Sequence, residues 1–343
     1  MMWLTWRQFR TQTIVATAGL VVVAIVLAVS GVQLADKFHG SIAGCAAHGS
    51  CGQLAGDFLQ SLRGSGYQAV ALGITVLIYA VPGLIGVFWG APLITREIEG
   101  HTLSLAWTQS VTRIRWLAVK VAMIGLVAIA TAGLLSFMAS WWINPVYEAS
   151  AKVGTGRGVV NRLWPIVFGI NGIVPIGYAA FGFALGLAFG VLIRRTLPAM
   201  AATLAVFAGI QVVWPQLVRP HLIPPLRGIA PIVLSRINEL MIDPSRHMFV
   251  QGVFNKPGAW VLSNQTIDQA GHVFTGPAPR ACLGGTQKAC DAAVGRLHLR
   301  QLVSYQPASR YWAFQWYETA IFVTLALLLV AYCYWRVSRR RLT

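Results

Sequence analysis

Six long apolar runs divide the chain, and each is long enough to cross a lipid bilayer as a helix. The hydrocarbon core of a bilayer requires about 20 consecutive apolar residues in a helix. The hydrophobic positions within these runs occur on every helical face. On the surface helices of a soluble domain they are confined to one face. The predicted spans are Thr13 to Leu34, Tyr67 to Trp89, Leu117 to Trp142, Trp164 to Ile193, Leu197 to Val218 and Tyr317 to Trp335.

Polar segments between these runs set the domain organisation. The fourth run is longer than a bilayer needs, which predicts a tilted helix or one that extends into the interface. Only three residues, Arg194 to Thr196, separate it from the fifth run, so these spans are expected to form a tight helical hairpin. We therefore expect an all-α membrane protein with six transmembrane helices. Its expected parts are an N-terminal interfacial segment at 1–12, helices one to five at 13–218 with a cytoplasmic loop at 90–120, a large extracytoplasmic loop at 219–316 between helices five and six, and helix six with a basic tail at 317–343.

Two of these parts leave alternatives open. The segment 1–12 combines Trp3, Trp6 and Phe9 with two arginines, so it forms either a short amphipathic helix on the membrane surface or an ordinary aromatic and basic flank. We expect it to be retained, because the apolar run that follows is too long for a signal peptide. The loop 219–316 is rich in proline near its start, which favours short re-entrant helices followed by an exposed cap.

Composition and charge support a membrane protein and its orientation. Hydrophobic residues make up 56% of the 343 residues and charged residues 11%, whereas soluble domains carry about 25% charged residues. The net charge of +17 does not indicate nucleic-acid binding, because much of it flanks the spans, where it suits anionic lipid headgroups. With the N-terminus inside, the short cytoplasmic segments have a net charge of +10 and the two short outer loops +2. Basic residues in short loops stay on the cytoplasmic side, so we expect a cell-membrane protein with both termini in the cytoplasm.

Four of the five cysteines lie in the predicted outer loops. Close cysteine pairs suit disulfides in an oxidising compartment, which predicts the bonds Cys45–Cys51 and Cys282–Cys290. Neither pair has C-x-x-C spacing, so a zinc site is disfavoured and we expect no metal.

No catalytic constellation is present in the sequence. The chain lacks a P-loop, paired carboxylates, H-E-x-x-H and G-x-S-x-G. Glu318 is the one acidic residue within a predicted span; it is either a substrate or proton site or an interfacial carboxylate. Gly182, Gly186 and Gly190 lie on one face of the fourth span, where small residues let helices approach closely. We expect this stripe to serve packing.

The stretch from Gly90 to Lys120 is the most informative part of the chain. It reads GAPLITREIEGHTLSLAWTQSVTRIRWLAVK. This segment is similar to the permease subunits of bacterial ABC-2 type exporters, particularly the separate-chain permeases of actinobacteria. Three further stretches agree with that family: W-L-T-W-R-Q from Trp3, R-R-T-L-P-A-M from Arg194, and F-Q-W-Y-E from Phe314.

The resemblance implies a function, partners and site residues. It implies a type V exporter-like permease fold, two permease copies side by side, each docked on a cytoplasmic ABC ATPase, and transport by alternating access. ATP and magnesium would belong to the partner, with no cofactor in this chain and no enzymatic activity of its own. The cytoplasmic loop would contain the coupling helix, with Glu97 and Glu99 either pairing with the ATPase or forming ion pairs with nearby arginines. The residues assigned to coupling are Arg96, Glu97, Glu99, Thr102, Trp107, Gln109 and Arg113.

Family analogy also places a substrate path along the second and fifth spans at the permease dimer interface. The side chains assigned to it are Tyr79, Phe88, Phe207, Gln211 and Trp214. An apolar lining suits a hydrophobic or amphipathic small molecule, peptide or lipid-like cargo. Each aromatic residue could equally serve helix packing or face lipid. An integral membrane enzyme, or a channel or sensor scaffold without an ATPase partner, remains the alternative to an exporter permease.

Overall fold

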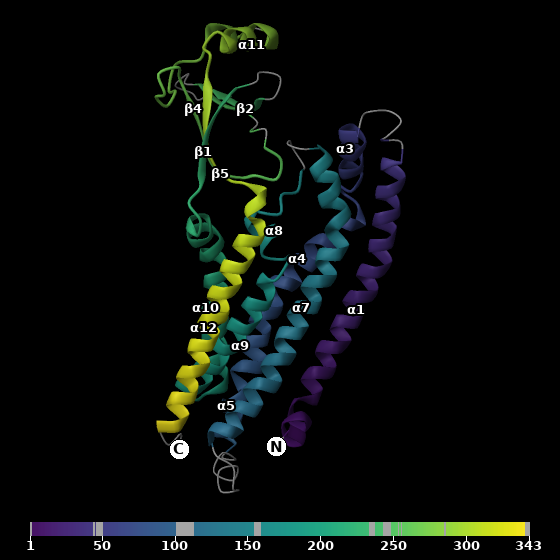
Figure 1. Ribbon diagram of the computed structural model, residues 1–343, viewed down its shortest axis with the longest axis vertical. Helices are drawn as coiled ribbons and strands as arrows, with labels where there is room; N and C mark the ends of the chain where they lie inside the picture. The colour runs from purple at the N-terminus through teal and green to yellow at the C-terminus, as the bar shows by residue number, and fades with distance from the viewer. Residues whose placement is uncertain are drawn as a thin grey trace.

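The computed structural model describes residues 2–43, 45, 51–100, 113–153, 159–232, 237–242, 248–252, 254, 256–284 and 286–339. Within these residues, six helical stretches are long and apolar enough to cross a membrane: Phe9–Ile42, Gly66–Glu99, Ile114–Val153, Val174–Ile193, Thr196–His221 and Ala308–Arg339. They run side by side in one bundle, with both termini at one end and the β-strands at the other (Figure 1). The six predicted spans are therefore confirmed by length and composition.

The membrane part is built from long helices, two of which continue through π-helical turns. The long helices are α1 (Met2–Ile42), α4 (Gly66–Ile85), α7 (Arg113–Val153), α9 (Val174–Ile193), α10 (Thr196–Val213) and α12 (Tyr311–Arg339). The π-turn η1 (Gly86–Gly90) continues α4 into α5 (Pro92–Glu99), while η2 (Trp214–Val218) and the 3-10 turn η3 (Arg219–His221) continue α10. The predicted interfacial segment at 1–12 is thus not a separate helix, because its described residues belong to α1. The start of the predicted cytoplasmic loop is likewise helical.

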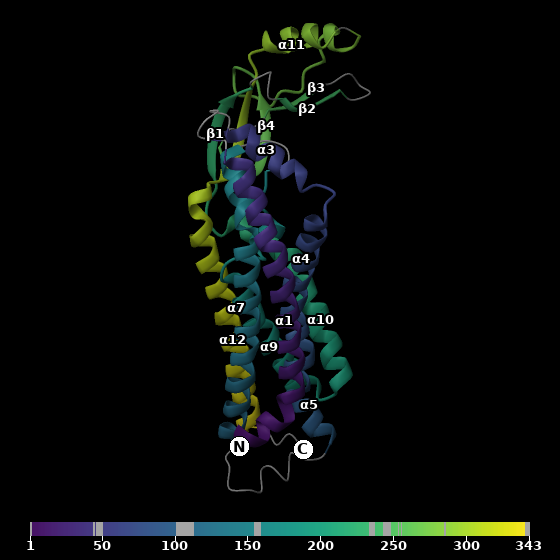
Figure 2. The same cartoon turned by 90° about the vertical axis from the view of Figure 1, so that its right-hand side faces the viewer.

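Helix α9 is the centre of the bundle. Its side chains are apolar around the whole helix, and most are buried, as expected for a helix without a polar face. Helices α4, α5, α7, α10 and α12 all pack against it, and Figure 2 shows it enclosed between them. Helix α10, in contrast, exposes Leu197, Leu204 and Val212 on the outside of the bundle, and η2 exposes Leu217. These apolar side chains face the region that lipid or another protein chain would occupy.

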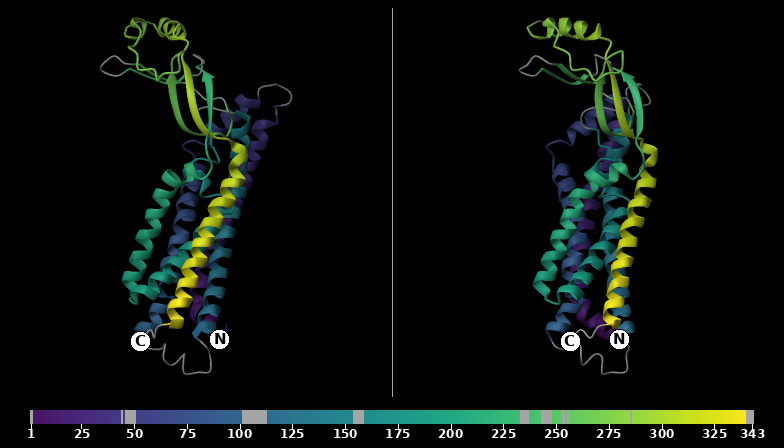
Figure 3. Two further views of the ribbon diagram at one scale, coloured as in Figure 1. Left: turned by 60° about the vertical axis from the view of Figure 1, so that its left-hand side comes forward. Right: turned by 90° about the vertical axis from the view of Figure 1, so that its left-hand side faces the viewer.

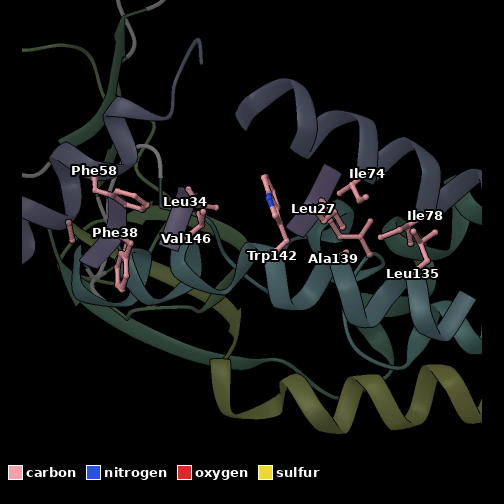
Figure 4. Close-up of a cluster of buried hydrophobic side chains, with 13 residues drawn as sticks. Leu27, Leu34, Phe38, Phe58, Ile74, Ile78, Leu135, Ala139, Trp142 and Val146 are labelled. Atoms are coloured by element: carbon pink, nitrogen blue, oxygen red, sulfur yellow. The ribbon is translucent and has the colours of Figure 1, made fainter. Parts of the chain in front are cut away.

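A second core joins α1 to its neighbours near the strand end of the bundle. Leu27, Leu34 and Phe38 of α1 pack against Phe58 of the short helix α3 (Cys51–Ser61) and against Trp142 of α7 (Figure 4). The Trp142 indole N–H donates a hydrogen bond to Ser30 Oγ at 2.9 Å. Cys51, the first residue of α3, forms a disulfide with Cys45. These contacts fix the outer half of α1.

The predicted fourth span, Trp164 to Ile193, is wrong at its beginning. A four-residue helix, α8 (Pro165–Phe168), is followed by a turn in which Gly172 has a φ of +71°, a conformation that favours glycine. The continuous helix α9 begins only at Val174. Gln315 of α12 accepts hydrogen bonds from the backbone N–H groups of Ile173 and Val174, at 2.9 and 3.1 Å. A side chain 141 residues away in sequence therefore caps this helix, which no local pattern reveals.

The turn between α9 and α10 is as short as predicted. Helix α9 ends at Ile193 and α10 begins at Thr196. Arg194 has a φ of 59°, and its backbone N–H donates to Gly190 O at 3.1 Å. This left-handed residue closes α9 and reverses the chain. The predicted helical hairpin is confirmed.

The segment between the fifth and sixth spans contains strands, so the prediction of an all-α chain holds only for the membrane part. Strands β1 (Leu226–Pro231), β5 (Arg300–Gln306) and β4 (Trp260–Ile267) form an antiparallel sheet in that order. Strands β2 (Ile237–Ile242) and β3 (Met248–Gly252) form a separate hairpin. Strand β5 alternates buried and partly exposed positions from Arg300 to Tyr305, the period-2 pattern typical of a half-buried strand.

We call residues 226–306 the cap, because they form the end of the molecule beyond the helices (Figure 3). The cap includes the 3-10 turn η5 (Arg280–Cys282) and helix α11 (Gln287–Gly295), which the disulfide Cys282–Cys290 joins. The turn η6 (Ala308–Arg310) leads from the cap to α12. Gln306 donates to Ile223 O at 2.6 Å, and Asn161 donates to Ala259 O at 2.7 Å. Buried amide side chains thus attach the cap to the helices.

Candidate functional site

Helix α5, at the end of the bundle with the termini, carries the described part of the predicted coupling segment. Proline at its first position suits a helix start, and Pro92, Ile94 and Thr95 are buried. Ile94 packs in a cluster with side chains of α7, α9 and α12, including Trp116, Leu187 and Val337. The inner face of α5 is therefore joined to three membrane helices.

Glu97 links α5 to α7. Its Oε1 atom forms an ion pair with Lys120 Nζ, and the two side chains are only 15% and 7% exposed. The Lys120 ammonium also lies 4.6 Å from the centre of the Trp116 ring, a cation–π distance. Nearby arginines were the intramolecular partners expected from the sequence, whereas the partner in the structure is Lys120. Breaking a buried ion pair leaves an uncompensated charge, so this link is much stronger than an exposed pair.

Glu99 links α5 to α10. Its carboxylate accepts hydrogen bonds from the Thr196 backbone N–H at 2.8 Å and from the Thr196 hydroxyl at 2.6 Å. The Thr196 hydroxyl is also 2.8 Å from Thr95 Oγ1. Thr196 is the first residue of α10, so the carboxylate caps a helix N-terminus, where the helix dipole favours negative charge. Two stretches that carried the family resemblance, R-E-I-E and R-R-T-L-P, meet at this contact.

The other predicted coupling residues divide into two groups. Arg96 is exposed on α5 and is available to a partner at this end of the bundle. Arg113 is the first residue of α7, and its side chain lies outside the described part of the structure. Thr102, Trp107 and Gln109 also lie outside the described residues. The structure therefore places Arg96, Glu97 and Glu99 together and leaves the rest as predictions.

A row of glycines, which we call the glycine seam, brings the backbones of the second span and α9 into direct contact. A Cβ atom on Gly186 would collide with the backbone of Gly86, and one on Gly90 would collide with the backbone of Phe183. Gly182 is similarly pressed against the carbonyl of Pro82. Small residues let two helix backbones touch directly. The stripe predicted to serve packing does so, and η1 lies against α9 without side chains between them.

The predicted substrate-path residues make different contacts in the described part of the structure. Tyr79 donates its hydroxyl to Ile166 O at 2.9 Å, and Phe207 is buried between Gly83 and Gly182. Phe88 is half exposed and lines a groove beside α1. These three residues thus serve different contacts.

The two remaining path residues lie near the outer end of α10 and carry unsatisfied polar atoms. Both amide atoms of Gln211 and the indole nitrogen of Trp214 are buried without a hydrogen-bond partner among the described residues. The Trp214 ring lies 4.7 Å from that of Phe322. Such polar atoms are rare in folded proteins and call for a water or ligand partner. This observation keeps Gln211 and Trp214 as candidates for a transport path.

A buried ion pair, which the sequence analysis missed, holds the outer end of the bundle together. Arg219 donates from Nε and Nη2 to the two carboxylate oxygens of Glu318, at 2.8 and 2.9 Å. Arg219 also donates to Pro165 O at 2.8 Å, and the Tyr178 hydroxyl donates to Glu318. The side chains of Arg219 and Glu318 are 1% and 0% exposed. Arg219 and Glu318 have opposite charges and lie at the outer ends of the fifth and sixth predicted spans. This was the sequence feature from which their pairing could have been predicted.

Glu318 therefore has its hydrogen-bonding capacity satisfied within the protein. Its carboxylate binds three donors from two side chains, so the structure favours a structural role over a substrate site. Among the described residues no group of three or more histidines, cysteines, aspartates or glutamates is placed to hold a metal ion. The described residues of this site provide mechanical links between helices.

Six membrane-length helices in one bundle, with α9 at its centre, define a multi-pass membrane protein. A family model described as ABC-2 membrane transporter related matches residues 17–219. Because the match covers more than half of the chain, this protein belongs to that family, and the resemblance read from the sequence is confirmed. The protein is thus a transporter permease, of a family that generally works with an ATPase subunit. No curated protein and no solved structure matches the chain.

Proposed function

We propose that this chain is the permease subunit of an ATP-driven exporter, docked through α5 on a separate cytoplasmic ABC ATPase that binds ATP and magnesium. The observation that carries the proposal is the double attachment of α5. Glu97 ties it to α7 and Glu99 ties it to α10, while its inner face packs on α9 and α12. A force applied to α5 is therefore delivered to four membrane helices at once.

The transmission follows from the physical character of these links. The glycine seam brings η1 and α9 into backbone contact, and closely packed interfaces move as rigid bodies or switch between discrete arrangements. An ATP-driven closure of the partner would push α5 together with the hairpin of α9 and α10. Movement of that hairpin against α1 and α7 would open and close the path, as alternating access requires.

Two independent features support an orientation with both termini in the cytoplasm. The end of the bundle with the termini carries Arg96, Arg194 and Arg195, as the positive-inside rule demands. The opposite end carries both disulfides, Cys45–Cys51 and Cys282–Cys290, and disulfides persist in oxidising compartments. In this orientation the cap is the extracytoplasmic segment between helices five and six of a type V exporter-like fold in the cell membrane.

We further propose that two permease copies and two ATPases form the working complex. The outward face of α10 is apolar and exposed in the described part of the chain, which suits a second copy at that face. A path along α4 and α10 would then be shared by two subunits. Its apolar walls, together with the unsatisfied atoms of Gln211 and Trp214, suit an amphipathic cargo with a hydrogen-bonding group.

Co-purification and ATP turnover test this proposal. The tagged chain, expressed with a P-loop ATPase encoded beside it, is expected to retain that ATPase in detergent and to change its ATP turnover after reconstitution in liposomes. Glu99→Gln removes the negative charge at the N-terminus of α10. This variant is expected to bind the ATPase normally and to reduce the response of ATP turnover to transported compounds. Asp268→Asn, in the cap, is the matched control. Absence of a bound ATPase, or an equal response in both variants, would contradict the proposal.

A further inference from the structure

Two adjoining cavities lie between α1 and the continuous helix α4–η1–α5, toward the end of the bundle with the termini. The larger has a volume of about 700 Å³ and is lined mainly by apolar side chains of α1 and α4. The smaller has a volume of about 300 Å³, and its lining includes Arg96, Glu97 and Lys120. Gln12 and Phe88 line both. The two cavities adjoin at these residues, where Gln12 Nε2 donates a hydrogen bond to Phe88 O at 3.2 Å, and we call them the α1–α4 groove and its polar pocket.

The depth of the groove matches one leaflet of a membrane. Its lining extends from Thr11 to Val23 on α1 and from Leu77 to Trp89 on α4. At a rise of 1.5 Å per residue each stretch is roughly 18 Å long, and half of the bilayer's hydrocarbon core is roughly 15 Å. The groove thus begins near the membrane surface and ends near the midplane. Its size and apolar lining fit a hydrocarbon chain.

The polar pocket presents an exposed cation and a buried carboxylate oxygen that has no hydrogen-bond partner among the described residues. Glu97 uses Oε1 for Lys120, but its Oε2 atom is buried and has no hydrogen-bond partner among the described residues. Arg96 also lines the polar pocket and is exposed. A buried carboxylate oxygen without a donor is unfavourable. A ligand that carries both an anion and an N–H donor would satisfy Arg96 and Glu97 together.

We propose that the α1–α4 groove and its polar pocket bind a phospholipid with a primary-amine headgroup, drawn from the leaflet at the end of the bundle with the termini. The phosphate lies at Arg96, the ammonium donates to Glu97 Oε2, and one acyl chain fills the α1–α4 groove. A choline headgroup has no N–H to donate, and a glycerol headgroup has no cation for the carboxylate. The headgroup would rest on α5, so the lipid would contact the element that we assign to coupling. Binding requires neither the ATPase nor transport, so its failure is distinguishable from failure of the proposed function.

Lipid competition on the full chain tests the inference. The delipidated protein in detergent is incubated with equimolar phosphatidylethanolamine, phosphatidylcholine and phosphatidylglycerol of identical chains, and native mass spectrometry counts the lipids retained. We expect phosphatidylethanolamine to be preferred by about tenfold or more, the factor for one charge-assisted hydrogen bond. Glu97→Gln is expected to bring the three lipids close to parity. Glu99→Gln removes the same charge two residues away, outside the pocket, and is expected to keep the preference.

Further variants keep the test decisive if Glu97→Gln does not fold. The double variant Glu97→Gln with Lys120→Met removes both charges of the buried pair and should also abolish the preference. Gly19→Phe fills the groove, since a Cβ at Gly19 meets nothing within 4 Å, and should reduce retention of all three lipids. Gly209→Phe, at an equally open position outside the groove, should not. Equal retention of the three lipids by the wild type, unchanged retention in Gly19→Phe, or cross-linking of position 19 to a second copy of this chain would overturn the proposal.

Discussion

Removal of either partner from the ion pair between Arg219 and Glu318 is expected to destabilise the outer end of the bundle severely. The pair joins η3, at the end of the fifth span, to α12, and Arg219 also holds the carbonyl of Pro165. Both side chains are almost fully buried. Glu318→Gln leaves an uncompensated arginine in this environment, and Arg219→Met leaves an uncompensated carboxylate.

The magnitude follows from burial. Breaking a buried pair by removing one partner costs about 3–5 kcal/mol, because the remaining charge is desolvated without compensation. Replacing both partners removes both charges, so the double variant Arg219→Met with Glu318→Gln is expected to cost less than the sum of the single changes. The difference is the coupling energy of a double-mutant cycle, which reaches 0.5–3 kcal/mol or so for residues in direct contact.

This cycle is measured by thermal unfolding of the purified protein in detergent. The readout is the fraction of protein that stays monodisperse at each temperature. Both single variants are expected to lose Tm by several degrees, with partial recovery in the double variant. Asp268→Asn breaks an exposed pair with His272 and is expected to leave Tm unchanged, since exposed pairs contribute little. Additive effects of the two changes, or single variants as stable as the wild type, would refute the reasoning from burial.

Three further predictions concern packing, capping and the cap disulfide. Gly186→Ala is expected to lower the free energy of unfolding by at least about 1–3 kcal/mol, because the added Cβ collides with the backbone of η1. Gly209→Ala, at an open helical position, is expected to raise it by about 0.5–1 kcal/mol. Tm measurements of the two variants check the contrast. Gln315→Leu orphans two backbone amides at the start of α9 and is expected to cost about 1–3 kcal/mol, measured in the same way. Cys282→Ser is expected to destabilise the α11 region by about 2–3 kcal/mol and to speed proteolysis within 280–295, whereas Cys333→Ser, in α12, leaves the cleavage rate unchanged.

The spans and their order could be predicted from the sequence because the membrane imposes a strong and simple constraint. Backbone groups in lipid must be satisfied within each helix, so long apolar runs predict spans reliably. The hairpin at Arg194 and the glycine stripe at Gly182, Gly186 and Gly190 could be predicted for the same reason, since short connections and small residues have direct geometric consequences.

The remaining features depend on contacts between residues distant in sequence. The break before Val174 is stabilised by Gln315, and Arg219 finds Glu318 99 residues further along the chain. The partner of Glu97 proved to be Lys120, 23 residues away on α7, although three arginines also lie nearby in the sequence. The strands of the cap were missed because short alternating stretches in a proline-rich segment give a weak local signal. Sequence patterns therefore pointed to α5 as the segment to which we assign coupling, and its connections to other helices were found in the structure.

The central claim is that α5 is the surface through which a cytoplasmic ATPase drives this permease. Photo-crosslinking from a benzophenone side chain in place of Arg96, within the complex of this chain and the co-expressed ATPase, tests it most directly. The account predicts an adduct with the ATPase from position 96 and none from position 316, an exposed site near the cap. An adduct from position 316, or a co-purifying ATPase that never reacts with position 96, would contradict it.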